Sequence, residues 1–334
     1  MKISASIYSD KKRPLERVIQ DLVGHQIDLL HVDCNDSLDV FKDIENIRKW
    51  CDTPIDLHII TEEPEKYFPY LRKHPVEYVT FQFENLKTPL KIPEDISGKK
   101  GLAVTTPTDV SVFSEFDYMD FILIMATIPG QSGGVFDQSN FAKIRKFRKQ
   151  YPRKSIHVDG GVNAEVSFIL RNMGVSSSVS GSYLFGEASV GNALMNLTQR
   201  DIHSQYCIRD FMTPLAESPN IEMKGATTKS ILECVENGKM GFALVLGTSN
   251  KLYGLVSSAD IRKALLAKIE APLTIAAEDL INKSPIAILG SATVNELLKK
   301  IKSCPFPIMY LPVIDNNRNA IGIVNFVHLI KGEI

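Results

Sequence analysis

Short apolar runs rich in β-branched residues alternate with longer amphipathic segments from Lys2 to about Leu197. This alternation is typical of repeated strand–helix units. Eight runs follow one another with the length and composition of strands: 3–8, 28–33, 54–60, 78–84, 101–106, 120–126, 155–161 and 176–182. Eight parallel strands are the number that closes a barrel, so the pattern predicts an α/β fold, a (β/α)8 or TIM barrel.

Amphipathic segments between these runs predict helices, for example over 14–23, 141–150 and 164–173. The fourth connection, 85–98, differs because it carries two prolines, which disfavour a long helix. We therefore expect the chain between the fourth and fifth strands to be largely non-helical.

The pattern of apolar and polar residues changes after a polar stretch near residues 198–206. Two similar halves of roughly sixty residues follow, each reading as helix, strand, turn, strand and helix, over 227–265 and 292–331. A short segment at 209–214 before the first half is echoed by 278–285 before the second. The sequence predicts a barrel domain over 1–200, a linker over 201–207 and an α+β repeat domain over 208–334.

Composition narrows the range of partners. The 334-residue chain is 44% hydrophobic with a formal net charge of -1, so neither nucleic acid nor an anionic membrane is indicated, and small ligands are expected. Its five cysteines are scattered and form no C-x-x-C pair, which predicts reduced thiols. An early charged segment and the lack of an apolar run of ~20 residues predict a cytoplasmic protein.

Candidate metal ligands cluster at the ends of predicted strands. His31 and Asp33 point to one face because they are two residues apart in a strand, and His58 and Asp159 end two further strands. A lone histidine in a strand is more often a core residue, but joint placement at the C-terminal ends of barrel strands favours a site. Two imidazoles and two carboxylates suit a divalent metal such as zinc, iron or manganese.

Eight segments resemble, in order, the signature segments of ribulose-phosphate 3-epimerases: 4–10, 29–36, 55–67, 78–84, 101–108, 123–134, 157–162 and 179–186. The resemblance implies that His31, Asp33, His58 and Asp159 hold the metal. It also implies that Asp33 and Asp159 are the catalytic acid–base pair and that Ser6 helps to position Asp33. The expected activity is epimerisation of ribulose 5-phosphate to xylulose 5-phosphate, or of a related phosphosugar, in pentose phosphate carbohydrate metabolism.

Proton transfer at C3 explains why two carboxylates suit this reaction. One aspartate removes the proton from one face, and the other returns a proton to the opposite face, which inverts the centre. Phosphate is expected to bind backbone amides after the last three strands, where glycine allows close approach. A single glycine-rich turn is often a plain loop, but three adjacent ones reinforce each other; the positions are Gly130, Gly133, Gly160, Gly161, Gly181 and Ser182.

Several positions depart from the family pattern. The loop after residue 36 is shorter, Asn35 replaces a methionine, Gln82 replaces a histidine, and Gln131 replaces an aromatic residue. We interpret these as substrate-side positions. They are compatible with a larger phosphosugar, with an active site closed by another chain, or with a degraded enzyme. The alternative function is a non-catalytic sensor of phosphosugars and nucleotides.

The C-terminal repeat resembles a tandem pair of cystathionine-β-synthase (CBS) domains. By that resemblance Ser257 contacts phosphate and Asp260 accepts hydrogen bonds from a ribose, so an adenine nucleotide is a possible effector. The second half has Asn325 and His328 at these positions, which leaves its nucleotide site in doubt. Helix capping is the competing interpretation of Ser257 and Asp260. We expect a regulatory module and a homodimer or higher homo-oligomer.

Overall fold

The computed structural model describes residues 1–87, 90–127, 133–198, 206–304 and 308–326. The chain divides into two compact units. Described residues up to 198 belong to the first unit, and residues 206–326 belong to the second. Most of the predicted linker, 201–205, lies outside the described residues.

Eight parallel strands close into a barrel in the order of the sequence, as the sequence predicts. Neighbouring strands pair in a register that places Asp33 beside His58 and Met125 beside Asp159. The strands are β1 (Lys2–Ser6), β2 (Leu29–Asn35), β3 (Ile55–Ile60), β4 (Tyr78–Gln82), β5 (Lys99–Thr105), β6 (Phe121–Met125), β7 (Ser155–Asp159) and β8 (Ser177–Ser180).

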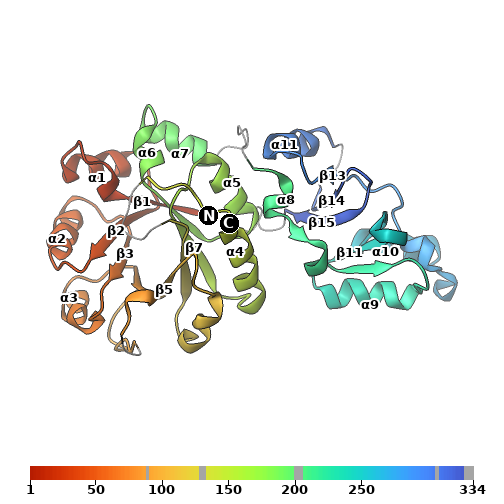
Figure 1. The fold of residues 1–334 in the computed structure, drawn as a ribbon, viewed down its shortest axis with the longest axis horizontal. Helices are drawn as coiled ribbons and strands as arrows, with labels where there is room; N and C mark the ends of the chain where they lie inside the picture. The colour runs from red at the N-terminus through yellow and green to blue at the C-terminus, as the bar shows by residue number, and fades with distance from the viewer. Residues whose placement is uncertain (88–89, 128–132, 199–205, 305–307, 327–334) are drawn as a thin grey trace. The chain divides into compact units, whose positions relative to one another are not determined.

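Helices surround the barrel strands (Figure 1). They are α1 (Leu15–Gly24), α2 (Val40–Trp50), α3 (Phe68–Lys73), α4 (Ser139–Gln150), α5 (Ala164–Asn172), α6 (Ser182–Gly186) and α7 (Val190–Thr198). Short 3-10 helices are η1 (Ile7–Ser9), η2 (Pro64–Tyr67), η3 (Phe83–Asn85) and η4 (Val110–Phe116). The helices predicted over 14–23, 141–150 and 164–173 are confirmed as α1, α4 and α5. In the described part of the fourth connection, η3 is the only helix, as the two prolines predict.

An aromatic layer forms the floor of the barrel below the C-terminal strand ends. The Phe121 ring stacks on His157 with centroids 4.1 Å apart, and Tyr78 packs against both rings. Gly101 makes room for this layer, since a Cβ there would lie 2.3 Å from the Phe121 ring. Burial of His157 lowers its pKa to about 4, so this histidine belongs to the packed floor as a neutral group.

The second unit contains two sheets with the same core topology. In each, a short strand pairs in parallel with a second strand, and the second pairs antiparallel with a third. The first sheet has β10 (Asn220–Glu222), β11 (Phe242–Leu246) and β12 (Leu252–Ser257), and the second has β13 (Ile288–Leu289), β14 (Tyr310–Ile314) and β15 (Ala320–Asn325). The antiparallel register shifts at the same place, between Val245 and Leu246 and between Val313 and Ile314. The internal repeat predicted from sequence is therefore confirmed for the described strands.

The elements of this unit are α8 (Ile208–Phe211), β9 (Thr213–Pro214), η5 (Leu215–Glu217), β10 (Asn220–Glu222), α9 (Thr228–Gly238), β11 (Phe242–Leu246), η6 (Thr248–Asn250), β12 (Leu252–Ser257), α10 (Ser258–Ala267), η7 (Pro272–Thr274), η8 (Ala277–Leu280), β13 (Ile288–Leu289), α11 (Val294–Ser303), β14 (Tyr310–Ile314) and β15 (Ala320–Asn325). The helix predicted to end the second repeat lies outside the described residues. None of the described helices in either unit has the length and apolar character needed to span a bilayer.

Candidate functional site

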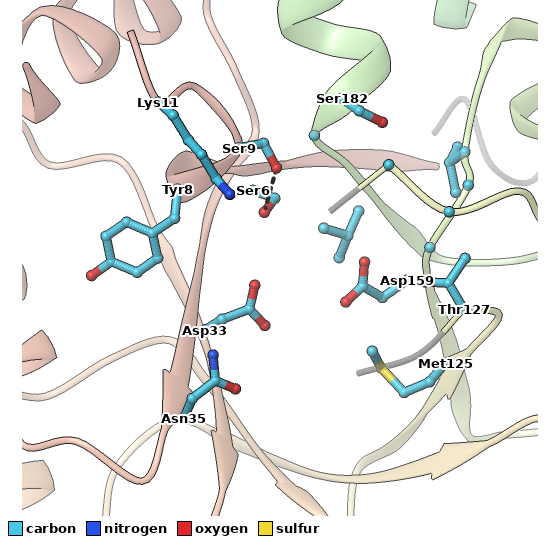
Figure 2. Close-up of a pocket in the computed structure, with 17 residues that line it drawn as sticks. Ser6, Tyr8, Ser9, Lys11, Asp33, Asn35, Met125, Thr127, Asp159 and Ser182 are labelled. Atoms are coloured by element: carbon cyan, nitrogen blue, oxygen red, sulfur yellow. Dashed lines mark hydrogen bonds between the residues drawn. The ribbon is translucent and has the colours of Figure 1, made fainter. Parts of the chain in front are cut away.

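A polar pocket opens at the C-terminal ends of the barrel strands. Its volume is about 190 Å³, and its walls come from β1, β2, β6, β7 and β8 with the turns that follow them. Figure 2 shows the carboxylates of Asp33 and Asp159 pointing toward each other from opposite walls. Their side chains remain 18% and 15% exposed, whereas the neighbouring His31 and His58 are completely buried. The carboxylates are thus the groups a ligand meets.

The four predicted metal ligands come together. His31, Asp33, His58 and Asp159 each offer one ligand atom, and these atoms lie within 4.8 Å of one another. His31 Nε2 is 3.3 Å from Asp33 Oδ1 and 3.6 Å from Asp159 Oδ2. His58 Nδ1 is 3.5 Å from Asp33 Oδ1. Three strands therefore deliver a single cluster of nitrogen and oxygen atoms.

His31 is held from behind by a buried carboxylate that the sequence interpretation did not single out. The Oδ2 atom of Asp56, on β3, lies 2.9 Å from His31 Nδ1. The same oxygen accepts a hydrogen bond from Ser4 Oγ at 3.2 Å. An ionised carboxylate can only accept, so Nδ1 carries the proton and donates it. The other ring nitrogen, Nε2, then faces Asp33 and Asp159. The alternation in β3, which places Asp56 on the same face as His58, is the signal in the sequence.

His58 is also held from behind, and here the sequence interpretation needs a correction. Gln82 was expected on the substrate side, but it is buried and its Oε1 lies 2.9 Å from His58 Nε2. The reason is the inward-facing alternation of β4, which directs Gln82 toward the neighbouring strand β3. Because a carbonyl oxygen can only accept, Nε2 of His58 donates, and Nδ1 faces the cluster.

The carboxylates of the cluster differ in proton affinity. Burial opposes ionisation of Asp33, but His31 outweighs it and holds the Asp33 pKa well below its usual range. Burial, reinforced by the charge of Asp33, raises the pKa of Asp159 to about 6. Burial disfavours the charged form of His31, yet the carboxylates of Asp33 and Asp56 raise the His31 pKa well above its usual value. A positive charge between these carboxylates is therefore strongly favoured.

The arrangement fits a divalent cation. With Nδ1 of His31 and Nε2 of His58 acting as donors elsewhere, the remaining nitrogen of each ring, in its neutral form, turns a lone pair toward carboxylate oxygens. His58 Nδ1 is buried and has no hydrogen-bond partner among the described residues. Lone pairs facing one another repel unless a proton or a metal lies between them. Two imidazoles and two carboxylates form a donor set that zinc, iron or manganese accepts.

Glycines bring backbone close to the pocket on the side of β7 and β8. Gly160 and Gly161 have φ angles of 110° and 66°, and a Cβ on either would come within 2.2 Å of neighbouring atoms. A Cβ on Gly181 would lie 2.1 Å from Ser9 Oγ. The N–H groups of these three glycines donate no backbone hydrogen bond to any described residue. Gly133 and Ser182 line the same pocket, whereas Gly130 lies outside the described residues.

Other polar residues complete the wall. Ser6 lines the pocket and accepts a hydrogen bond from Ser9 Oγ at 3.1 Å; no hydrogen bond between Ser6 and Asp33 is present among the described contacts. Asn35 also lines the pocket, and Gln131 lies outside the described residues. Sequence reasoning missed Lys11, whose side chain points into the pocket (Figure 2). It follows a strand end in a charged stretch, and nothing in its local pattern distinguishes it.

The second unit has a separate cavity of about 480 Å³ at the N-terminal end of α10. Ser257 and Asp260 both line it. They also form a capping box: Ser257 N donates to Asp260 Oδ2 at 3.0 Å, and Asp260 N donates to Ser257 Oγ at 3.3 Å. The capping interpretation thus describes contacts that are present, and it leaves both side chains on the cavity wall. At the corresponding positions of the second repeat, Asn325 ends β15 and His328 lies outside the described residues.

Comparisons with known proteins agree with this architecture. Residues 2–185 match the model of the ribulose-phosphate 3-epimerase family, and residues 277–332 match the CBS domain. The ribulose-phosphate 3-epimerase of Bacillus subtilis is 27% identical over 212 residues, covering 59% of this chain and 98% of that protein. That of Methanocaldococcus jannaschii is 28% identical over 228 residues, covering 64% and 95%.

The crystal structure of CBSX2 in complex with AMP matches 38% of this chain and 96% of that chain, with 23% identity and a TM-score of 0.33.

Proposed function

Because the chain belongs to the ribulose-phosphate 3-epimerase family, a family of isomerases, we propose that it is a metal-dependent epimerase acting at C3 of ribulose 5-phosphate or a related ketose phosphate. The observation that carries this proposal is the cluster of His31, Asp33, His58 and Asp159 at the mouth of the barrel. Conversion of ribulose 5-phosphate to xylulose 5-phosphate by the purified protein tests it.

Asp33 and Asp159 are proposed to exchange protons with the substrate. Their carboxylates point toward each other from opposite walls of the pocket, so a sugar carbon between them has one carboxylate on each face. One aspartate takes the C3 proton, and the other gives a proton to the opposite face. In the reverse reaction the two residues exchange roles. This arrangement supports epimerisation better than hydrolysis, which needs an activated water molecule.

The four-residue cluster is proposed to hold a divalent cation, either zinc, iron or manganese. Such a cation supplies fixed positive charge where negative charge develops on the substrate oxygens. His31 and His58 direct one nitrogen each toward it, since Asp56 and Gln82 occupy their other nitrogens. The two carboxylates keep enough exposure to meet substrate as well.

The phosphate group is proposed to lie against the backbone of Gly160, Gly161 and Gly181, with Gly133 and Ser182 beside it and Gly130 contributing from the sixth turn. Unpaired N–H groups that converge on a concave surface bind oxyanions, and the absence of Cβ atoms lets them approach. Lys11 is the only cationic side chain among the described residues that line the pocket.

The second unit is proposed to bind an adenine nucleotide and to regulate the barrel. Its support is the cavity that Ser257 and Asp260 line, which offers a hydroxyl and a carboxylate on a wall with Arg262 and Lys263 nearby. Cationic side chains suit phosphate groups, and a carboxylate can accept hydrogen bonds from a ribose. We further propose domain bounds of 1–200 and 208–334 with a linker between them, and a homodimer or higher homo-oligomer in solution.

A thermal shift measurement tests nucleotide binding. We expect AMP, ADP or ATP, at about 100 times Kd, to stabilise the full-length protein by roughly 2.7 kcal/mol and to raise a melting temperature by several degrees. Asp260→Asn should remove most of this shift because the amide is a weaker acceptor for a ribose diol. If none of the three nucleotides shifts the wild-type transition, the adenine nucleotide role is wrong.

A further inference from the structure

A chain of hydrogen-bonded polar groups extends from the buried His58 and Gln82 to the exposed Glu84 and the turn after β5. His58 Nε2 is 2.9 Å from Gln82 Oε1, and Gln82 Nε2 donates to Glu84 Oε2. The other oxygen of Glu84, Oε1, accepts from Thr105 N at 2.8 Å, from Thr105 Oγ1 at 2.7 Å and from Thr108 Oγ1. Glu84 touches neither the pocket nor the proposed metal ligands.

The donors and acceptors of this chain permit a single orientation of the Gln82 amide. Both hydrogens on its Nε2 have acceptors, one being Glu84 Oε2 and the other Ala103 O at 3.4 Å. Turning the amide over would place its oxygen against two other oxygens. Gln82 Oε1 must therefore face His58, and because this oxygen only accepts, the proton of His58 resides on Nε2. Nδ1, the nitrogen that faces Asp33, keeps its lone pair.

Glu84 is fixed as an acceptor by the backbone. The Thr105 N–H group cannot reverse its polarity, so the oxygen opposite it remains an acceptor in any variant. Partial desolvation disfavours the charge of Glu84, but hydrogen bonds from Thr108, Thr105 and Gln82 outweigh it and lower the Glu84 pKa. An ionised carboxylate at this position offers acceptors on both sides, toward Thr105 and toward Gln82.

We propose that Glu84 is a positioning residue for the metal site, acting through Gln82 to fix the His58 tautomer that leaves Nδ1 free to bind a cation. The proposal rests on the metal-binding function proposed above and deepens it. Gln82 occupies a position where the family pattern has histidine, so in this chain the residue that orients His58 is a glutamine held by Glu84.

Substituting Glu84→Gln tests the proposal because it reverses the donors and acceptors along the hydrogen-bonded series Glu84–Gln82–His58, which we call the tautomer relay. The introduced amide must keep its oxygen toward Thr105 N, which turns its NH₂ group toward Gln82. The Gln82 amide then rotates, gives up its long contact of 3.4 Å with Ala103 O and donates to His58 Nε2. The His58 proton moves to Nδ1, where it blocks the cation. We expect a loss of about 10- to 100-fold in affinity for Co²⁺, measured by visible absorption of the full-length apo protein under competition with a chelator.

A double variant provides the rescue. In Gln82→Glu with Glu84→Gln, the side chain at position 82 accepts from His58 Nε2 and from the NH₂ group at position 84, while the amide oxygen at position 84 accepts from Thr105. Every donor again meets an acceptor, and total charge is unchanged. Affinity for Co²⁺ and its absorption spectrum should return to the wild-type values. If the double variant binds Co²⁺ as weakly as Glu84→Gln does, the tautomer relay is wrong.

Lys143→Met separates positioning from support of the turn. Lys143 Nζ donates to the carbonyls of Thr105, Thr106 and Thr108 at 2.6, 2.7 and 2.6 Å, so it holds the same turn without touching the relay. Folded Lys143→Met protein should keep wild-type Co²⁺ affinity; a loss equal to that of Glu84→Gln would show that Glu84 only braces the turn. If wild-type protein binds no Co²⁺ at all, the proposed metal site itself fails. If wild type binds and Glu84→Gln binds equally well, only this inference fails.

Discussion

Asp159→Asn is expected to lower kcat for epimerisation by about 10³-fold or more. An amide cannot take or give the C3 proton, while its shape and its contacts with the pocket stay close to those of the carboxylate. Asp159 faces Asp33 from the opposite wall, so its removal leaves one face of the substrate carbon without an acid or base. Steady-state kinetics at saturating metal measure the loss.

Two further measurements on this variant separate chemistry from binding. Phosphosugar binding, followed by calorimetry, should remain largely intact because the phosphate contacts lie elsewhere. Asp120→Asn is the matched control, since Asp120 is an exposed carboxylate that accepts from Lys100 N at 2.8 Å, at the start of β6 and away from the pocket. Turnover by Asp159→Asn equal to that of Asp120→Asn would contradict the assigned acid–base role.

Gly161→Ala is expected to raise KM by about tenfold or more and to destabilise the barrel by about 1–3 kcal/mol. A Cβ at this position would lie 2.2 Å from Phe136 N, and the φ angle of 66° is unfavourable for alanine. The backbone must shift, and its N–H group moves with it. Because phosphate is held equally in ground and transition states, the loss should fall on KM more than on kcat.

Gly186→Ala is the control for that substitution. Gly186 ends α6, and a Cβ there would have nothing within 4 Å. Kinetic constants and urea unfolding should both match those of the wild type. A Gly161→Ala protein that is destabilised but has an unchanged KM would place phosphate binding away from this turn.

The barrel was predictable because its alternation of strand and helix segments repeats along the chain. Side chains alternate between the two faces of each strand, so the inward positions of His31, Asp33 and His58 could be predicted without knowledge of the fold. The fourth connection could be interpreted from its two prolines. The connection between β5 and β6 is harder to interpret, since the short 3-10 helix η4 takes the place of a longer α-helix. Pro107 is the only proline of this connection and lies near its beginning, where proline is tolerated in a helix.

Residues that support the site were not predictable in the same way. Asp56 and Gln82 act on histidines of adjacent strands, and their roles depend on strand pairing and on which atom of each side chain meets the ring. Glu84 depends on a turn 21 residues later in the chain. Gln82 was interpreted as a substrate-side change because the family comparison shows an altered residue type but not its hydrogen-bond partner.

In the second unit, sequence left two interpretations of Ser257 and Asp260 open, and the structure shows why both were reasonable. The residues form the capping box of α10, and the same helix end borders a cavity. Helix capping involves residues close together in the chain, so a sequence pattern predicts it directly. Ligand binding at that helix end depends on the whole cavity, whose walls include residues from distant segments such as Asn282 and Tyr310.

Proton exchange at C3 of ribulose 5-phosphate tests the central claim most directly. The metal-reconstituted, full-length protein is incubated with this substrate in deuterated water, with and without a chelator, and followed by NMR. We predict that deuterium enters C3 as xylulose 5-phosphate accumulates, and that the chelator stops both processes. Xylulose 5-phosphate formed at the same rate with chelator present would contradict the metal-dependent account, and no exchange at C3 would remove ribulose 5-phosphate as the substrate.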